Sequence, residues 1–368
     1  MEWQLKPYRA PNFDSPALQN APDALWQVAP MDGIAPENYH ATTIFPEYFK
    51  VNGAWLLAQE SHMDCVAVLE EGKIAVKEFR NLRAGDRVCV GRSEDGSQGV
   101  LVHTDGFAEG SDGERDVFSF RQSRSRETAF SKDYDALYRL LEYEKAHGRI
   151  VWVMGPACAF DYDSRDAFAR LVDEGYVHGL LAGNALATHD LEGAYRGTAL
   201  GQDIYTQQTV PMGHYNHIDT INRVRACGSI AAFVEKENIR DGIMAHCVRN
   251  HVPFVLAGSI RDDGPLPDVI ASAYQAQDAM RDIIRGATTV ICMATTLHAI
   301  ATGNMTPSYR VRSDGTVRQV YFYTVDISEF SVNKLGDRGS LSARSFVTNA
   351  QDFVVNIARG LKLYQSKE

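Results

Sequence analysis

Short apolar runs alternate with longer amphipathic stretches over the second half of the chain. Six runs have the length and turn boundaries of buried strands: 150–154, 179–182, 254–257, 289–294, 320–325 and 345–348. Helical spacing of apolar residues marks the stretches 133–143, 165–174, 217–225, 268–285 and 351–363. Because strands and helices alternate, this half is expected to be an α/β domain with a mostly parallel sheet covered on both faces.

The first half has a different pattern. Its first 35 residues are rich in Pro, Ala and Asn without periodicity and are predicted to form an extended arm. Strand-like runs follow at 51–55, 65–69, 73–76 and 87–91. The pair Asn52 and Gly53 predicts a tight hairpin turn. We therefore expect an arm at 1–35, a smaller β-rich domain with a connecting loop and helix at 36–145, and the α/β domain at 146–368.

Composition narrows the partners and the compartment. A net charge of −10 leaves no broad basic surface, so nucleic acid is not expected as a partner. Since no apolar run reaches the roughly 20 residues of a membrane helix and the N-terminus lacks a signal pattern, a cytoplasmic protein is expected. The six cysteines are expected to be reduced and mostly buried, although Cys158 at a strand end could be a reactive thiol. No metal site is predicted, since His214 and His217 lack an obvious third ligand.

The densest chemistry follows the expected strand 254–257. Gly258 would let a ligand approach the backbone, and Arg261 offers a planar donor fork to a carboxylate or phosphate. The neighbouring Asp262 and Asp263 suit an amine, a ribose diol or proton transfer. Taken alone, this segment could be an ordinary turn, because Asp and Gly are common turn formers.

Polar residues also follow the other expected strands. They are Asn184, His189, Asp190, Thr295, His298, Asn304, Asp326 and Asp337. Because the carboxyl ends of parallel strands meet at one edge of a sheet, they are expected to share a small-ligand site there. Singly, Asn184 and Asp326 could be helix caps and His298 a buried structural histidine.

A standard dinucleotide fingerprint is absent. The first strand of the α/β half ends in Gly155 and Pro156 without the GxGxxG pattern. If a dinucleotide binds, the backbone amides after Gly183 and Gly258 are the candidate donors to its diphosphate.

Four longer phrases resemble a known family. They are LLAGNALATHDLEGAYRGTALG, GHYNHIDTINRVRACGSIAAF, GIMAHCVRNHVPFVLAGSIRDDGPLPDVI and ATTLHAIATGNMTP. They resemble the LOR/SDH bifunctional-enzyme conserved-domain family, which includes archaeal-type ornithine cyclodeaminases and the carboxy-terminal half of cyanobacterial arginine dihydrolase–ornithine cyclodeaminase fusions. The likeness extends to YHATTIFPEYFKVNGAWLLAQESHMDCVAVL in the β-rich half and covers residues 36–355.

The resemblance implies a fold and an activity. It implies a Rossmann-like NAD-binding domain of the deoxyhypusine-synthase type, preceded by a β-rich domain for substrate binding or oligomerisation. It also implies conversion of L-ornithine to L-proline and ammonia by internal hydride transfer through NAD. A small basic amino acid is then the expected substrate, and a homo-oligomer is the expected assembly.

The match also assigns roles to residues. Cofactor-facing positions are Asn184, Ala185, Gly258, Ser259, Ile260, Arg261, Thr295, Leu297, Asp326 and Asp337. The candidate catalytic residues are Asp190, Asp262, Asp263 and His298. The candidate substrate-binding residues are His189, His214 and Asn304.

Three departures from the family's pattern leave the substrate open. Residues 155–164 read GPACAFDYDS where the family reads GPAxVHTGG, the charged segment 308–320 looks inserted, and Asn349 stands where the family tends to have Asp. Two alternatives therefore stay open. One is a divergent enzyme for an arginine-derived or N-modified basic amino acid, and the other is a non-catalytic NAD or amino-acid sensor.

Overall fold

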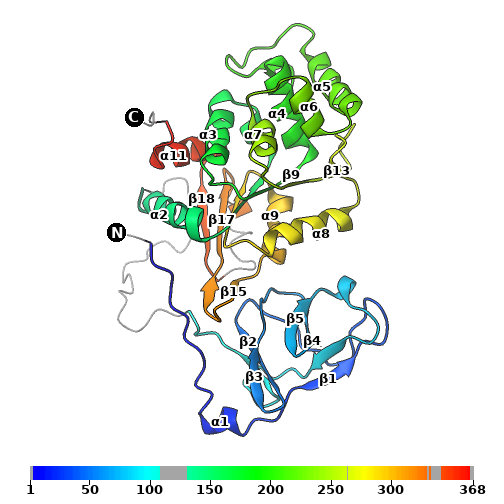
Figure 1. The fold of residues 1–368 in the computed structure, drawn as a ribbon, viewed down its shortest axis with the longest axis vertical. Coiled ribbons are helices and arrows are strands. Elements are labelled where there is room, and N and C mark those ends of the chain that lie inside the picture. Colours follow the sequence, from blue (N-terminus) through cyan, green and yellow to red (C-terminus); the bar gives the residue numbers. More distant parts are fainter. Residues whose placement is uncertain (1–2, 108–130, 263, 330, 333–340, 365–368) are drawn as a thin grey trace.

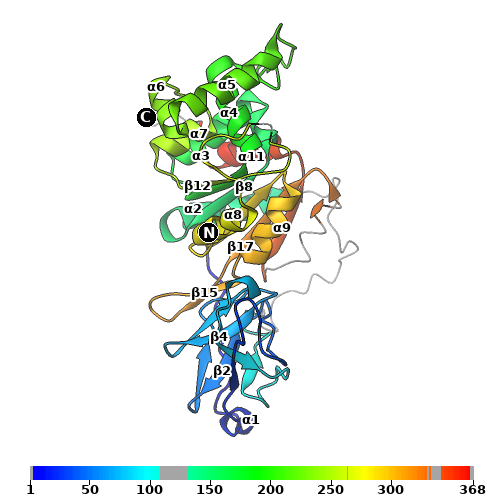
Figure 2. The same cartoon turned by 90° about the vertical axis from the view of Figure 1, so that its right-hand side faces the viewer.

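The computed structural model describes residues 3–107, 131–262, 264–329, 331–332 and 341–364. It has a mainly β domain and a larger α/β domain, which lie one above the other in Figures 1 and 2. The N-terminal segment runs along both domains. Trp3 packs edge-on against Tyr321 of the α/β domain, whereas the backbone of Arg9 donates to the carbonyl of Gly106 in the β domain.

The β domain consists of two antiparallel sheets, ordered β1-β6-β4-β5 and β3-β2-β7. Its elements are α1 Pro16–Gln19, β1 Leu25–Val28, β2 Glu47–Val51, β3 Ala54–Leu57, β4 Val66–Glu70, β5 Lys73–Lys77, η1 Phe79–Asn81, β6 Arg87–Val90 and β7 Val100–Val102. The predicted hairpin between β2 and β3 is confirmed: Asn52 and Gly53 have φ of 51° and 80°, the left-handed values of a type I′ turn. The predicted arm is only partly extended, because it contains α1 and because β1 joins the edge of the first sheet beside β6.

The α/β domain is built on a seven-stranded parallel sheet, ordered β13-β12-β9-β8-β14-β17-β18. Its strands are β8 Ile150–Met154, β9 Gly179–Gly183, β12 Phe254–Ala257, β13 Val269–Ile270, β14 Thr289–Met293, β17 Tyr321–Asp326 and β18 Ala343–Val347. All six predicted strands are confirmed, with ends shifted by two residues at most. The strand β13 was not predicted: its residues were expected to begin the helix that starts only at Ala273.

Helices cover both faces of this sheet. They are α2 Ser131–His147, α3 Tyr162–Asp173, α4 Asn184–Arg196, α5 Gly213–Cys227, α6 Ile230–Lys236, α7 Ile243–Arg249, α8 Ala273–Ile284, α9 Thr296–Met305 and α11 Ala350–Gly360, with the 3₁₀ turn η2 at Pro156–Ala159. Alternate strand residues face opposite sides. Trp152 and Ile291 pack in the core under α2–α7 and α11, whereas Val153 and Val290 pack under α8 and α9. The sequence did not predict α4, α6, α7 and α9; the polar residues of α4 and α9 had been assigned to loops at the strand ends.

The charged segment 308–320 joins the two domains. It forms the hairpin of β15 (Tyr309–Val311) and β16 (Val317–Gln319), which points toward the β domain in Figure 1. The Tyr309 hydroxyl donates to the carbonyl of Ala58 at 2.8 Å, and Arg318 forms a buried ion pair with Glu144 of α2. The segment therefore connects the β domain with the α/β domain. It had been expected to affect the substrate pocket, but it does not lie at the carboxyl edge of the sheet.

The cysteines agree with a further prediction. The six cysteines are free, and Cys158 is 1% exposed. Burial raises the pKa of the Cys158 thiol to about 12, so this residue is a packed thiol and not a reactive one. Within the described ranges, every helix is too short or too polar to cross a membrane.

Candidate functional site

The sheet changes its direction of growth between β8 and β14. From β8 the chain builds outward through β9 and β12, whereas β17 and β18 follow on the other side of β14. Here Gly155, which follows β8, packs against the backbone of Ala294, which follows β14: a Cβ on Gly155 would lie 2.0 Å from the carbonyl oxygen of Ala294. The segments after both strands thus start backbone to backbone and then diverge, which is where open α/β sheets bind their ligands.

Two helices begin at this edge without a side-chain cap. The helix α4 follows Gly183, which has no side chain, and α9 follows Thr295, whose side chain does not accept from the helix. By contrast, α3, α8 and α11 are capped by Asp161, Ser272 and Asn349. Uncapped N-termini offer free N–H groups at the positive end of the helix dipole, which favours phosphate or carboxylate. The starts of α4 and α9 therefore form a candidate anion site, and Asn349 does the capping that Asp would do.

His298 lies between these two helix starts. It belongs to the first turn of α9, and its Cε1 atom is 3.2 Å from where a Cβ on Gly183 would stand. A side chain at position 183 would therefore crowd the imidazole. Burial lowers the pKa of His298 below its ordinary value of 6.5, so the ring is neutral at pH 7 and can accept a proton.

Apolar side chains are exposed at the same edge. Ile260 follows β12, Leu297 lies in the first turn of α9 and Ile327 follows β17, and all three are more than half exposed. Exposed apolar surface next to an anion site suits the flat rings of a nucleotide.

The loop after β12 satisfies its own backbone. The amide of Gly258 donates to the carbonyl of Ile270 in β13, and that of Ser259 donates to Oδ2 of Asp262 at 2.8 Å. A Cβ on Gly258 would lie 3.1 Å from the backbone after β13. The glycine therefore permits close contact with the chain itself, and the amides of Gly258 and Ser259 already have acceptors. The approach of a ligand to Gly258 stays a prediction. The Arg261 side chain is exposed and Asp263 lies outside the described residues.

Asp190 is held away from this edge. Its carboxylate is fully buried and accepts from Nε of Arg165 at 2.9 Å and from the backbone amides of Ile243 and Met244 at 2.9 and 2.8 Å. The last two bonds cap α7. Because its oxygens are used in this way, Asp190 has a structural position in place of the catalytic one expected for it.

The other predicted residues divide between the edge and more distant places. Asp326 ends β17 and accepts from the Ser328 amide at 2.8 Å, a bond within the turn after the strand; the helix cap that was the alternative for Asp326 is made by Ser328, whose hydroxyl accepts from the Ser331 amide. His214 lies exposed on α5, and Asn304 belongs to the last turn of α9, about 9 Å along the helix axis from His298. Neither shares the edge with His298. Ala185 lies in the first turn of α4, and Asp337 lies outside the described residues.

A group on α4 was missed in the sequence. Nδ1 of His189 and Nδ1 of His217 each lie 3.4 Å from Oε2 of the buried Glu192, which also accepts from the Thr198 hydroxyl at 2.9 Å. The two imidazoles stack, and Phe160 packs against His189 with ring centroids 5.0 Å apart. Burial would raise the pKa of Glu192, but the hydrogen bonds outweigh it and lower the pKa to about 2. We call His189, Glu192 and His217 the helix cluster.

Only part of this cluster has a signal in the sequence. His189 and Glu192 are three residues apart, so they would share a face once a helix is predicted there. His217 comes from α5, and only the packing of α5 on α4 brings it near.

Known proteins match the chain over most of its length. Residues 136–357 match the family model of the Rossmann fold in the C-terminal part of arginine dihydrolase ArgZ-like proteins, and residues 46–129 match the model of the first region of that part. The ornithine cyclodeaminase of Methanopyrus kandleri is 39% identical over 346 residues, which are 92% of this chain and 79% of that protein.

Two solved structures agree with this family. A conserved LOR/SDH protein from Methanococcus maripaludis S2 matches with a TM-score of 0.82 at 36% identity, covering 93% of this chain and 98% of that one. The ternary complex of AgrE with ornithine and NAD+ matches with a TM-score of 0.58 at 32% identity, covering 95% of this chain and 47% of that one. The chain therefore belongs to the family of the ArgZ-like C-terminal region, which includes the LOR/SDH protein and the archaeal ornithine cyclodeaminases.

Proposed function

We propose that this protein is an NAD-dependent ornithine cyclodeaminase that converts L-ornithine to L-proline and ammonia. The observation that carries this proposal is the pair of uncapped helix starts at the switch point, with His298 between them. Relatives support it: the archaeal proteins named ornithine cyclodeaminase are similar over most of this chain, and AgrE forms a complex with ornithine and NAD+.

The edge of the sheet has the groups that NAD requires. The amides at the starts of α4 and α9 would hold the diphosphate, and Asp326 at the end of β17 would accept from a ribose hydroxyl. The apolar side chains of Ile260, Leu297 and Ile327 would contact the rings. When bound, NAD supplies a hydride acceptor that later returns the hydride, so the reaction needs no external reductant.

Three side chains of this edge suit the substrate. Neutral His298 would accept a proton from the distal ammonium, which frees that amine to attack, and would return the proton to the departing ammonia. The exposed guanidinium of Arg261 suits the substrate carboxylate. Asp262 keeps one carboxylate oxygen beyond the bond to Ser259 and would bind a cationic amine.

A second candidate is the same reaction type on another basic amino acid. Where the family reads His-Thr followed by two glycines, this chain has Phe160, Asp161 and Tyr162. Phe160 packs on His189 and Tyr162 stacks on Tyr205 with centroids 4.2 Å apart. This aromatic packing favours a pocket shaped for a different side chain, such as that of an arginine-derived amino acid.

Ornithine labelled with deuterium at Cα tests the proposal. With NAD and no added reductant, we expect proline and ammonia in equal amounts, with deuterium retained at Cα of proline because the hydride returns internally. Loss of the label to solvent, or no proline at saturating NAD, would contradict the proposal. Turnover of another basic amino acid alone would establish the second candidate, and thermal stabilisation by NAD without any product would indicate a sensor.

We also propose a homo-oligomer that works in the cytoplasm. Met212, Tyr215 and Ile218 on and beside α5 are more than half exposed, and such an apolar surface supports self-association. Light scattering on the purified chain measures its mass, and a monomer at micromolar concentration would contradict this.

A further inference from the structure

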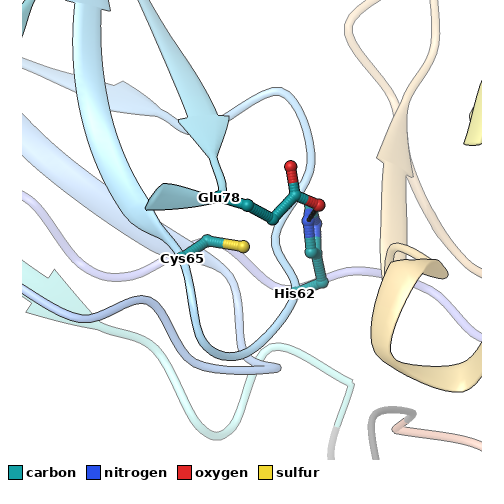
Figure 3. A group of neighbouring side chains, drawn as sticks. All are labelled: His62, Cys65 and Glu78. Atoms are coloured by element: carbon teal, nitrogen blue, oxygen red, sulfur yellow. Dashed lines mark hydrogen bonds and ion pairs between the residues drawn. The ribbon is translucent and has the colours of Figure 1, made fainter. Parts of the chain in front are cut away.

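A second group of metal-binding residue types lies in the β domain, at its junction with α8. Cys65 directly precedes β4 and Glu78 directly follows β5, and the antiparallel register that pairs Val66 with Lys77 places Cys65 opposite Glu78. His62 comes from the loop that leads into β4. Figure 3 shows the three side chains pointing toward one another. We call His62, Cys65 and Glu78 the junction cluster.

The spacing of the ligand atoms suits a metal ion. The imidazole nitrogen, the thiol sulfur and the carboxylate oxygen all lie within 4.8 Å of one another, and Nε2 of His62 is 3.4 Å from Oε1 of Glu78. That distance is long for an N–H···O hydrogen bond. It is close to the roughly 3.3–3.8 Å that separates neighbouring ligands in tetrahedral zinc sites, given Zn–ligand bonds of roughly 2.0–2.3 Å.

The chemistry of the three groups also suits zinc. Zn²⁺ binds thiolate, imidazole and carboxylate, and one of each is present. His62 and Cys65 are 3% and 1% exposed, whereas the Glu78 side chain is 18% exposed and leaves a path for the ion. The other carboxylate oxygen of Glu78 accepts from the side-chain Nδ2 of Asn81 at 3.0 Å. This bond orients the carboxylate, as hydrogen bonds from neighbouring residues orient metal ligands.

A positively charged side chain already lies beside this cluster. The guanidinium of Arg281 on α8 forms an ion pair with Oε1 of Glu78, the same oxygen that faces His62. Arg281 is 5% exposed; its Nη1 is the atom that pairs with Glu78, and its Nε lacks a hydrogen-bond partner among the described residues. The arginine is therefore only partly satisfied, and an ion at Glu78 would displace it toward the nearby Glu60.

The helix cluster has similar ligand spacing but lacks free acceptor positions. Glu192 already accepts from Thr198, from the amides of Leu200 and Gly201, and from His189. A metal there would have to break several of these bonds, whereas at Glu78 it would replace Arg281. The junction cluster is thus the better site.

We propose that His62, Cys65 and Glu78 bind a divalent cation of the zinc type, in competition with Arg281. Three protein ligands leave a fourth position for water, and the ion would fasten the loop before β4 to the end of β5. Its role is structural, because the cluster lies in the β domain, away from His298 and the carboxyl edge of the sheet. The sequence did not indicate this site, since Cys65 and Glu78 lie 13 positions apart, a spacing that fits no zinc motif.

Cobalt spectroscopy on the metal-free, untagged full chain tests the proposal. We expect Co²⁺ to produce a thiolate-to-cobalt charge-transfer band that saturates at one ion per chain and disappears when Zn²⁺ is added. Cys65→Ser should remove the band, whereas the control Cys89→Ser, another buried thiol of the same domain, should keep it. A band that is absent from the wild type, or that persists in Cys65→Ser, overturns the proposal.

Two further measurements keep the test decisive if Cys65→Ser fails to fold. Zn²⁺ should protect Cys65 of the wild type from alkylation by iodoacetamide in partly denaturing buffer, as mapped by mass spectrometry. Arg281→Gln should raise the affinity for Zn²⁺ by about tenfold, because it removes a competing positive charge from a nearly buried place. Equal alkylation with and without Zn²⁺, or an affinity lowered by Arg281→Gln, contradicts the site.

Discussion

The helix cluster and the junction cluster both bring histidine against a carboxylate, but the two carboxylates differ in what already binds them. Glu192 is fully buried among two imidazoles, a hydroxyl and backbone amides, and its pKa is lowered to about 2. Glu78 is partly exposed, and its inner oxygen faces His62 and an arginine whose Nε lacks a hydrogen-bond partner among the described residues. The comparison shows that proximity of ligand types is not enough. Whether the carboxylate oxygens are already occupied decides between a structural group and a site for an ion.

The largest effect should come from Asp190, the carboxylate that is paired with a buried arginine. We expect Asp190→Asn to lower the free energy of unfolding by about 3–5 kcal/mol, because it leaves Arg165 with less compensation in a buried place and weakens the cap of α7. Urea unfolding measures this. The matched control is Asp241→Asn, which removes the half-exposed partner of Arg165 and should cost much less. Equal losses in both variants would show that burial of the partner does not decide the effect.

A somewhat smaller effect is expected at Glu192. A folded-state pKa of about 2, below the ordinary 4.5, corresponds to about 3 kcal/mol of stability. Because the pKa is depressed on folding, this stability is present above pH 4.5 and is lost as the pH falls toward 2. Glu192→Gln should therefore be less stable than the wild type at pH 7, and the difference should shrink in acid.

Unfolding curves across this pH range measure the Glu192 contribution. Glu235→Gln on the exposed surface of α6 is the control and should change little at any pH. A difference between wild type and Glu192→Gln that stays constant from pH 7 to acid would mean that the charge of Glu192 contributes nothing.

The smallest pKa-dependent effect is expected at His298, because burial alone lowers the pKa of this side chain. It concerns the pH dependence of activity and not stability. The ring must be neutral to accept a proton, so kcat/KM for ornithine should hold at pH 6.5 and fall only at lower pH. His298→Gln should lower kcat and remove this acid limb, while His214→Gln on the exposed surface of α5 should leave the limb in place. A limb that persists in His298→Gln would assign it to another group.

Local patterns predicted the elements well where one signal dominates. The six main strands are apolar runs bounded by turns, and the turn at Asn52 and Gly53 requires left-handed backbone that few residue pairs adopt. The helices α4 and α9 were not predicted, because residues such as His189 and Asn304 make the segments read as polar loops. His189, for example, stacks on His217 of α5, a contact that a local pattern does not contain.

The site was predicted in outline and not in detail. The gathering of Asn184, His298 and Asp326 at strand ends follows from parallel-sheet geometry. That the loop at Gly258 uses its own amides, and that Asp190 points to Arg165 and α7, depends on contacts between segments 25 to 54 residues apart or on backbone packing.

The sequence by itself determined the β and α/β parts, the parallel sheet, the edge proposed for the ligand and the family. These follow from short-range periodicity, turn chemistry and long matching phrases. Only the tertiary structure decided which polar groups are free. It showed that the starts of α4 and α9 are uncapped, that Asp190 and Glu192 are occupied, and that His62, Cys65 and Glu78 converge beside Arg281. The physical reason is that a hydrogen-bonding group is used or free only relative to partners that the fold brings together from distant parts of the chain.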